Sequence, residues 1–444
     1  MFATLLLACN LLSYLILAKH LGQSHPATWF SLGWTALVLI HLATPLGLYP
    51  ISLLTAFVIV VGVWSFGLGA LSVKRTVLHP KFQPPISTTI LTIWAIIVTA
   101  ALVYGVHEFQ VSITTAVGVQ DFSSLDATKI RFAQTLGTVR GGGVGGLMFA
   151  MSPLVACLGL LGGMRVSRGW FALVPLAFWA SAQSPGRTFT LGLMATMLPF
   201  YFYIRTTSRP MRLNKVKVTS IALGTLTAAF VYFNSIGQSL GKNQALHEYL
   251  GDTKIPDFLA SPIVYQIGGM SALSKAQDTN FNPGEFGRNI FALIRIAAFL
   301  GFPVHVPDTI TNYVLVPFPF NVYTGFGDVW SDFGTIGVAI AFFAMGALAA
   351  HAHRRALEGR LNWAWVSSML MSVLASTPLT LRILYLDFVT VMTLGIVVFA
   401  SITIGGRRAM GIPRKNPPDS TPARTQSQDL SDGATPRLTG LNPP

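Results

Sequence analysis

Two carboxylates, Asp328 and Asp332, lie four residues apart in a stretch of polar, aromatic and glycine residues that leads into an apolar run at 338–346. The run has the composition of a membrane helix. An ionised group that faces lipid costs about 2–4 kcal/mol or more unless it is paired or hydrated, so carboxylates at the lip of such a helix are candidates for function. They could orient a hydroxyl group or accept its proton.

Guanidinium groups are predicted on the same side of the membrane as these carboxylates, from the charge distribution described below. Their planar forks match phosphate oxygens, and they can neutralise the charge that develops on a leaving diphosphate where no metal ion does so. The arginines concerned are Arg140, Arg187, Arg288 and Arg295. Together they predict a site for a lipid-borne diphosphate.

Each arginine also has a plainer interpretation. Arg187 ends a tight turn, where it could have a fixed role or pair with lipid headgroups. Arg288 and Arg295 fall nearly on one face of a helix, which could bind phosphate or be an ordinary amphipathic helix with solvated charges. Arg140 precedes a glycine cluster at 141–146 that could be a close-packing hinge or could bind an anion.

Polar side chains around the carboxylates could contact sugar, for which carboxylate and aromatic groups are suited. They are Glu285, His305, Asn321, Tyr323, Thr324 and Asp328. Asp332 directly precedes the apolar run, so it could serve as a catalytic group, as the capping carboxylate of a helix, or as both.

Several classes of chemistry have no signature in this sequence. The histidines offer no pair at metal-ligand spacing on one helix of the outer side, and no phosphate-binding loop or dinucleotide fingerprint is present. Cys9 and Cys157 lie within apolar runs, where cysteine behaves as a small hydrophobic residue. We therefore expect neither a metal ion nor a cofactor.

The composition is that of a membrane protein. Of the 444 residues, 52% are hydrophobic and 10% are charged, and the apolar residues are grouped into long runs. Runs of about 15 to 23 residues match the length needed to cross a hydrocarbon core of roughly 30 Å.

We expect an all-α polytopic fold with about eleven membrane-spanning helices, whose ends are uncertain by about 2–4 residues. The expected spans are 2–18, 28–44, 50–72, 87–106, 142–164, 169–184, 187–204, 218–236, 329–350, 362–378 and 382–404. Residues 1–404 then form the membrane domain. The tail at 405–444 is rich in Pro, Ser, Thr and Arg without periodicity, which predicts disorder.

The distribution of basic residues predicts the orientation. They are concentrated in every second connection, for example at Arg205, Arg209, Arg212, Lys215 and Lys217, and again in the tail. Because basic loops stay in the cytoplasm, the tail is predicted inside and the amino terminus outside, with the first helix retained. The net charge of +14 is therefore a topology signal, and we expect no nucleic-acid partner.

The longest connection, 237–328, is predicted to lie outside. Its many aromatic residues favour a loop that packs on the membrane surface and contains short amphipathic helices.

Several short motifs resemble those of one family of membrane enzymes. They are Ser261-Pro-Ile-Val-Tyr265-Gln, Pro317-Phe-Pro-Phe-Asn321-Val-Tyr323-Thr324 and Asp332-Phe-Gly334-Thr-Ile-Gly337, the last followed by Gly346. In this order the chain resembles the oligosaccharide repeat unit polymerases, the O-antigen polymerase (Wzy-type) family. The resemblance covers most of residues 100–350. One departure is the turn Ser184-Pro-Gly-Arg187, where the family has a Ser-Arg-Gly-like order.

The resemblance implies a GT-C-like enzyme of the bacterial inner membrane, with the active site on the periplasmic side. Such an enzyme transfers a growing chain from undecaprenyl diphosphate to a sugar hydroxyl of the next lipid-linked repeat. In this scheme Asp332, Arg288 and Arg187 would be catalytic, and the other arginines would grip diphosphate. Asp332 would orient or deprotonate the attacking hydroxyl, with Glu285, Asp328 and His305 as alternatives. Membrane lipids and a polysaccharide chain-length regulator would be further partners.

Two other functions fit the same sequence features. An O-antigen ligase would use the same kind of donor and deliver the chain to a different acceptor. A transporter of lipid-linked sugars would be expected to have charges at mid-membrane and inverted repeats. Neither feature is evident in this sequence, which favours an enzyme.

Overall fold

A computed structural model gives the fold of residues 1–44, 46–73, 85–121, 129–130, 144–183, 187–208, scattered positions between 224 and 238, 257–307, 311–381, 383 and 385–409. This part of the chain is almost wholly helical. Its one sheet is the two-residue pairing of β1 (Val314–Leu315) with β2 (Pro319–Phe320), which are antiparallel. The prediction of an all-α fold is confirmed at this level.

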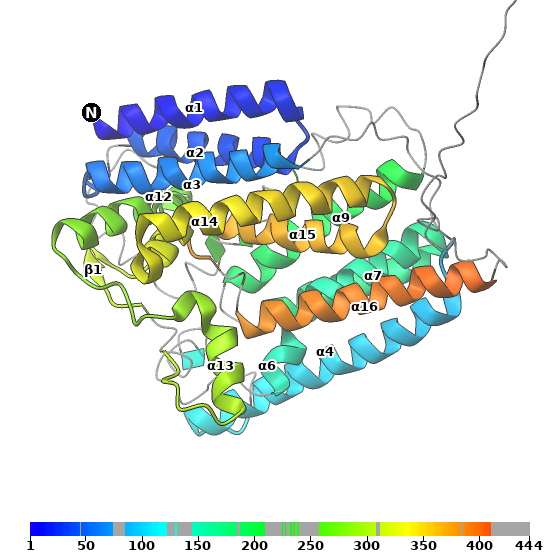
Figure 1. Cartoon of the computed structure of the whole chain (residues 1–444). Helices are drawn as coiled ribbons and strands as arrows, with labels where there is room; N and C mark the ends of the chain where they lie inside the picture. Colours follow the sequence, from blue (N-terminus) through cyan, green and yellow to red (C-terminus); the bar gives the residue numbers. More distant parts are fainter. Residues whose placement is uncertain are drawn as a thin grey trace, which may run out of the picture.

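The long helices run roughly parallel or antiparallel along one axis, and α13 lies across it (Figure 1). In chain order they are α1 (Phe2–Leu21), α2 (Pro26–Ala43), α3 (Leu53–Ser72), α4 (Thr88–Val117), α6 (Val144–Phe149), α7 (Ser152–Arg165), η2 (Arg168–Ala172), α8 (Leu173–Ala182), α9 (Arg187–Ser208), α12 (Asp257–Asp278), η3 (Arg288–Ile290), α13 (Phe291–Phe299), α14 (Thr324–Leu357), α15 (Leu361–Ser376) and α16 (Leu386–Ala409).

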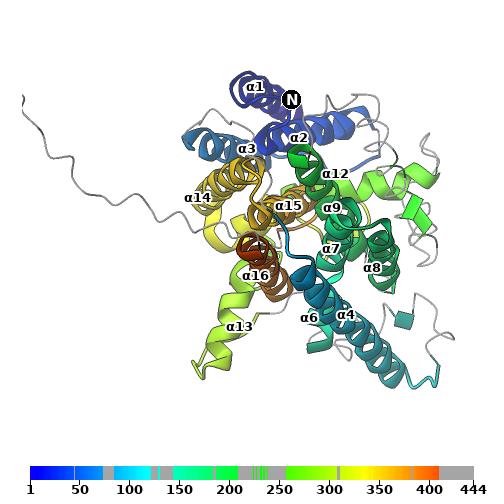
Figure 2. The same cartoon turned by 90° about the vertical axis from the view of Figure 1, so that its right-hand side faces the viewer.

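The buried side chains form two main clusters. One joins α1, α2, α3, α12 and α14, and the other joins α4, α7, α8, α9 and α16. Helix α15 contributes to both clusters and lies near the centre when the bundle is viewed end-on (Figure 2). The two halves of the bundle are therefore packed against a shared central helix.

The most extensive helix pair is α3 with α14, and two glycines allow it. A Cβ atom on Gly69 would lie 2.0 Å from the carbonyl oxygen of Phe343, and one on Gly346 would lie 2.0 Å from that of Phe66. The two backbones are thus in direct contact at both positions. Close approach of this kind is typical of membrane helices, whose association depends on packing at small residues.

Seven described helices are long and apolar enough to cross a membrane: Phe2–Leu21, Pro26–Ala43, Leu53–Ser72, Thr88–Val117, Gly146–Arg165, Thr324–Leu357 and Asp387–Ala409. Large apolar side chains on their outer faces are exposed, as lipid contact requires. Of the other predicted spans, 169–184 contains the ten-residue α8, which at about 15 Å is too short to cross alone. The predicted span 218–236 lies mostly outside the described residues.

Helix α12 is the main difference from the sequence prediction. This 22-residue helix lies within the segment that we expected to be a surface loop. Ser271, Ser274 and Gln277 on it are buried, and they face α2 and α3 in the core. Ser274 accepts a hydrogen bond from the backbone of Ser52, and Gln277 accepts one from Thr55. The helix is part of the bundle, and it supports the region that follows.

Basic residues are concentrated at one end of the bundle, although Lys275, Arg288 and Arg295 lie at the other end. The last turns of five described helices contain Lys19, Arg165, Arg205, Arg354, Arg355, Arg407 and Arg408. The carboxylates of the candidate site lie near the other end, with α13 and β1 (Figure 1). Helix α16 continues to Ala409, beyond the predicted start of the tail at 405, and residues 410–444 lie outside the described structure.

Candidate functional site

The two predicted carboxylates lie on a short helical segment that precedes a break in α14. Gly334 has φ 63° and ψ −168° inside this helix, a conformation that is essentially restricted to glycine. Residues 324–333 form the first segment. Residues 335–357 form the second, which at about 34 Å is long enough to span the hydrocarbon core. Asp328 and Asp332 therefore belong to a segment with its own direction at the end of the bundle.

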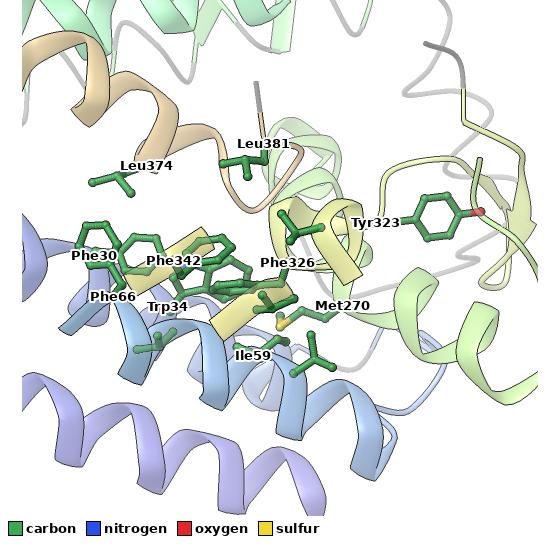
Figure 3. Packing of buried hydrophobic residues seen from close by; sticks show 14 of the residues in the cluster. Phe30, Trp34, Ile59, Phe66, Met270, Tyr323, Phe326, Phe342, Leu374 and Leu381 are labelled. Carbon is green, nitrogen blue, oxygen red and sulfur yellow. The ribbon is translucent and has the colours of Figure 1, made fainter. Parts of the chain in front are cut away.

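The first segment is anchored by Phe326, which is fully buried in the aromatic core (Figure 3). Its ring centroid is 4.4 Å from that of Phe342 and 4.6 Å from that of Trp34. Gly62 on α3 provides the space, because a Cβ atom there would lie 2.2 Å from the Phe326 ring. The core thus fixes the helix turn from which Asp328 projects.

The Asp328 carboxylate is buried and receives hydrogen bonds on both oxygens. Arg288 donates from Nη2 to Oδ1 at 2.5 Å. The hydroxyl of Thr380 and the backbone N–H of Leu381 donate to Oδ2 at 2.7 and 2.9 Å. These last two residues lie in the α15–α16 connection. That connection is itself held by Trp34, whose indole N–H donates to the Thr377 hydroxyl at 3.3 Å.

Arg288 is 4% exposed and uses one of its three guanidinium nitrogens in this pair. Its Nε and Nη1 are buried without a hydrogen-bond partner within the described residues. A Cβ atom on Gly284 would lie 2.3 Å from Nη1, so the backbone of this glycine lies directly against the guanidinium. A buried charged donor without a partner is costly, and in native proteins it often marks a binding site.

Asp332 is a capping group for the turn that contains Arg288. It accepts hydrogen bonds from the backbone N–H of Gly287 at 3.1 Å and of Asn289 at 3.0 Å, and from the Asn289 side chain at 2.7 Å. The same amide group also donates to the Asp328 carbonyl oxygen at 2.5 Å. Asp332 thus holds η3 against α14, and through η3 it positions Arg288. The sequence interpretation offered Asp332 as a cap for the apolar helix that starts behind it, whereas the turn that it caps in the structure is η3.

Three predicted sugar contacts, Tyr323, Thr324 and Asn321, have partners within the protein. The Tyr323 hydroxyl donates to the Asn312 carbonyl oxygen at 2.7 Å, and Thr324 is fully buried against Gly269. Burial raises the pKa of Tyr323 above its usual value, although the nearby positive charge of Arg288 opposes this, so the phenol stays neutral. Asn321 faces Thr311, which donates to its carbonyl oxygen.

The remaining described candidates lie outside this buried cluster. Arg295 is exposed on α13, where it covers the ring of Phe291 at 5.7 Å. Because Arg288 lies in the 3₁₀ turn η3, the two arginines do not share a regular helical face as the sequence predicted. His305 contacts Glu285 at 3.0 Å in an exposed pair.

Two predicted arginines cannot be placed relative to the cluster. Arg140 and the glycines that follow it at 141–143 lie outside the described residues. The backbone of Arg187 begins α9, and its side chain also lies outside the description. Their predicted roles stay predictions.

Sequence reasoning missed the residues that complete the ion-pair cluster, namely Asn289, Thr380 and Leu381. Asn289 lies in η3, whereas Thr380 and Leu381 lie in the α15–α16 connection, about 90 residues further along the chain. The available signal was local: Asn289 adjoins a predicted site arginine, and Thr380 lies in a short polar turn between two apolar segments. Neither signal indicates a partner.

Among the described residues, no group of three His, Cys, Asp or Glu side chains is arranged to hold a metal ion. The site contains a buried Arg288–Asp328 ion pair, and hydrogen bonds from Asn289 to Asp328 and Asp332 hold its two segments together. Such an arrangement can bind an anion through the unused guanidinium nitrogens. No family model, no curated protein and no solved structure significantly matches this chain, so the family resemblance stays a prediction from the quoted motifs.

Proposed function

We propose that this protein is a metal-independent glycosyltransferase of the bacterial inner membrane that polymerises oligosaccharide repeat units linked to undecaprenyl diphosphate. One observation carries the proposal. Arg288, at the end of the bundle opposite the basic helix ends, is buried with Nε and Nη1 unpartnered. A lipid-linked diphosphate supplies the oxygens that these donors lack.

In the proposed reaction, the acceptor hydroxyl oxygen bonds to C1 of the donor sugar as the bond between C1 and the diphosphate oxygen breaks. The diphosphate leaves with the electron pair, and Arg288 stabilises its negative charge. The hydroxyl proton passes to a carboxylate. Asp332 is better suited to position Arg288 than to accept this proton, because both of its oxygens already accept hydrogen bonds.

Substrate reaches the guanidinium by displacement of the segment at 282–286. This segment is irregular, and Gly284 within it lies against Nη1. In the proposal, Arg187 and Arg140 add further positive charge to the site, and Arg295 faces lipid headgroups. The bundle end with the ion pair is the periplasmic end, and the carboxyl-terminal tail is cytoplasmic.

The test is gene deletion followed by electrophoresis of the surface polysaccharide and complementation with variants. Deletion should remove the ladder of long chains while single repeats stay attached to their acceptor. Loss of all attachment would indicate a ligase, and an unchanged ladder would contradict both enzymes.

Arg288→Lys is the sharpest variant, because lysine keeps a positive charge beside Asp328 but lacks the fork that contacts two phosphate oxygens. We expect polymer yield to fall at least about tenfold at unchanged protein abundance on immunoblots. Arg360→Lys is the matched control, since Arg360 is exposed in the α14–α15 turn at the other end of the bundle, and it should retain the yield. Full activity of Arg288→Lys would remove this residue from the proposed mechanism.

A further inference from the structure

A second candidate site lies within the bundle, next to the α15–α16 connection that also contacts the ion pair. It is a partly enclosed cavity of about 140 Å³ between α7, α9, α12, α15 and α16. Since a liquid water molecule occupies roughly 30 Å³, the cavity has room for several waters or for part of a small polar ligand.

Two polar side chains that line the cavity could form hydrogen bonds with a ligand. Asp387 lies in the first turn of α16, and Gln266 lies on α12. Within the described part of the chain, neither side chain has a hydrogen-bond partner. The carboxylate can accept from hydroxyl groups, and the amide can both donate and accept.

Further lining groups are oriented so that their oxygens can act as acceptors. Ser372 and Ser376 donate to backbone carbonyls of their own helix, at 2.7 and 2.8 Å. Thr196 donates in the same way to the Gly192 carbonyl at 2.8 Å. Because each hydroxyl hydrogen is already used, a ligand that supplies hydrogen-bond donors suits these oxygens better than one that is only an acceptor.

Apolar rings complete the lining. Phe189 and Phe388 border the cavity from α9 and α16. Aromatic faces together with a carboxylate and an amide suit a ring that is apolar on its faces and has hydroxyl groups at its edge. A free phosphate or another anion is disfavoured, because the described lining has a carboxylate and no cationic side chain.

The cavity and the ion pair share one connecting segment. Leu379 lines the cavity, and the next two residues, Thr380 and Leu381, donate to Asp328. Ser376, which also lines the cavity, is within 3.4 Å of the Thr380 carbonyl oxygen. A sugar in the cavity and a diphosphate at Arg288 would therefore both border the same short segment.

We propose that this cavity binds a sugar ring of the substrate, with Asp387 accepting hydrogen bonds from its hydroxyl groups. The inference rests on the proposed function for the identity of the whole substrate, but it adds a site and a binding residue that the sequence analysis did not single out. Asp387 falls inside the predicted span 382–404.

The test is saturation-transfer NMR with the full chain held in amphipol, because maltoside detergents have sugar headgroups of their own. The probes are glucose, galactose, mannose, rhamnose and N-acetylglucosamine, with glycerol as the non-ring control. We expect transfer to at least one sugar and none to glycerol. Absence of transfer to every sugar of the panel would overturn the proposal.

Three variants locate the binding. Asp387→Asn should weaken the affinity for the sugar about tenfold, since a charge-assisted hydrogen bond becomes a neutral one. Ser372→Phe, which fills the cavity, should abolish transfer. Asp278→Asn is the matched control, because Asp278 is an exposed carboxylate that pairs with Tyr49, and it should bind as the parent does. Equal binding by all three variants would place the sugar elsewhere and refute the role of Asp387.

The two proposals fail in different ways. Arg288→Lys should keep the sugar signal but lose the thermal stabilisation that inorganic pyrophosphate gives the parent protein. Asp387→Asn should have a weaker sugar signal and keep the stabilisation by pyrophosphate. A sugar signal without any effect of pyrophosphate would support the cavity and contradict the diphosphate site.

Discussion

At the scale of single residues, the defining feature is the guanidinium of Arg288. Its Nη2 pairs with Asp328, whereas its Nε and Nη1 have no hydrogen-bond partner within the described residues. Burying an ion pair is costly in itself, and it is tolerated when hydrogen bonds satisfy the charges. Asp328 is fully satisfied by Arg288, Thr380 and Leu381. Arg288 is not satisfied, and in the proposed function its two unpartnered nitrogens bind the diphosphate.

A double-mutant cycle separates the structural role of this pair from its functional role. Asp328→Leu leaves Arg288 buried without its partner and should destabilise the protein by about 3–5 kcal/mol. Arg288→Met combined with Asp328→Leu replaces both charges by apolar groups and should recover most of this loss. Chemical unfolding of the purified proteins in one detergent provides the measurement.

Polymer yield then gives the second result of the cycle. If Arg288 binds diphosphate, the double variant should be folded and inactive. A folded double variant with normal polymer yield would show that the ion pair is only structural.

The residue types in this site could be predicted from the sequence, but their pairing could not. Asp328 and Asp332 are predicted because carboxylates at the lip of an apolar run are costly, and Arg288 because its planar fork suits phosphate. Which carboxylate pairs with the arginine depends on how η3 packs against α14, over about 40 residues of chain. Helical periodicity contains no information about that contact. The sequence consequently favoured Asp332 as the catalytic acid–base group, where the structure has it capping η3.

At the scale of elements, the site depends on the break in α14. Gly334→Ala should destabilise the protein by about 1–3 kcal/mol, because alanine at φ 63° and ψ −168° is strained. A helix that straightens to relieve this strain would move the segment with Asp328 away from Arg288. We therefore expect polymer yield to fall together with the thermal unfolding temperature.

Gly33→Ala on α2 is the control for this substitution. A Cβ atom at Gly33 meets nothing within 4 Å, and alanine has the higher helix propensity. The unfolding temperature of this variant should be unchanged or slightly raised. Parent-like behaviour of Gly334→Ala would show that the break is not required.

Helix α12 shows that hydropathy patterns predict the lipid-facing helices of a membrane bundle better than a helix surrounded by protein. The long apolar helices were predicted well, for example 50–72 against the observed Leu53–Ser72. Their outer faces contact lipid, so nearly every residue on them is apolar. Helix α12 is largely surrounded by protein, where Ser274 and Gln277 find partners on α3 and its start. Buried polar residues therefore made a core helix look like a loop.

At the scale of the whole molecule, the proposed function requires the ion pair to face the periplasm. Single cysteines test this in a background without Cys9 and Cys157. A cysteine at Phe302, which is 61% exposed beyond α13, should react with a membrane-impermeant maleimide in intact cells. A cysteine at Arg360, in the α14–α15 turn, should react only after permeabilisation. The reverse pattern would place the ion pair in the cytoplasm and exclude external polymerisation.

The glycine contacts between α3 and α14 have a mechanical consequence for this protein. Carbonyl groups of Phe66 and Phe343 lie against opposing glycines, so no side chain between the two backbones can change rotamer to permit rolling or sliding. The two helices therefore move as one unit, and under the proposed function the long part of α14 stays fixed to the amino-terminal helices while substrate enters. Any opening must then come from the irregular segments at 282–286 and 377–381, which lie next to this helix pair without belonging to it.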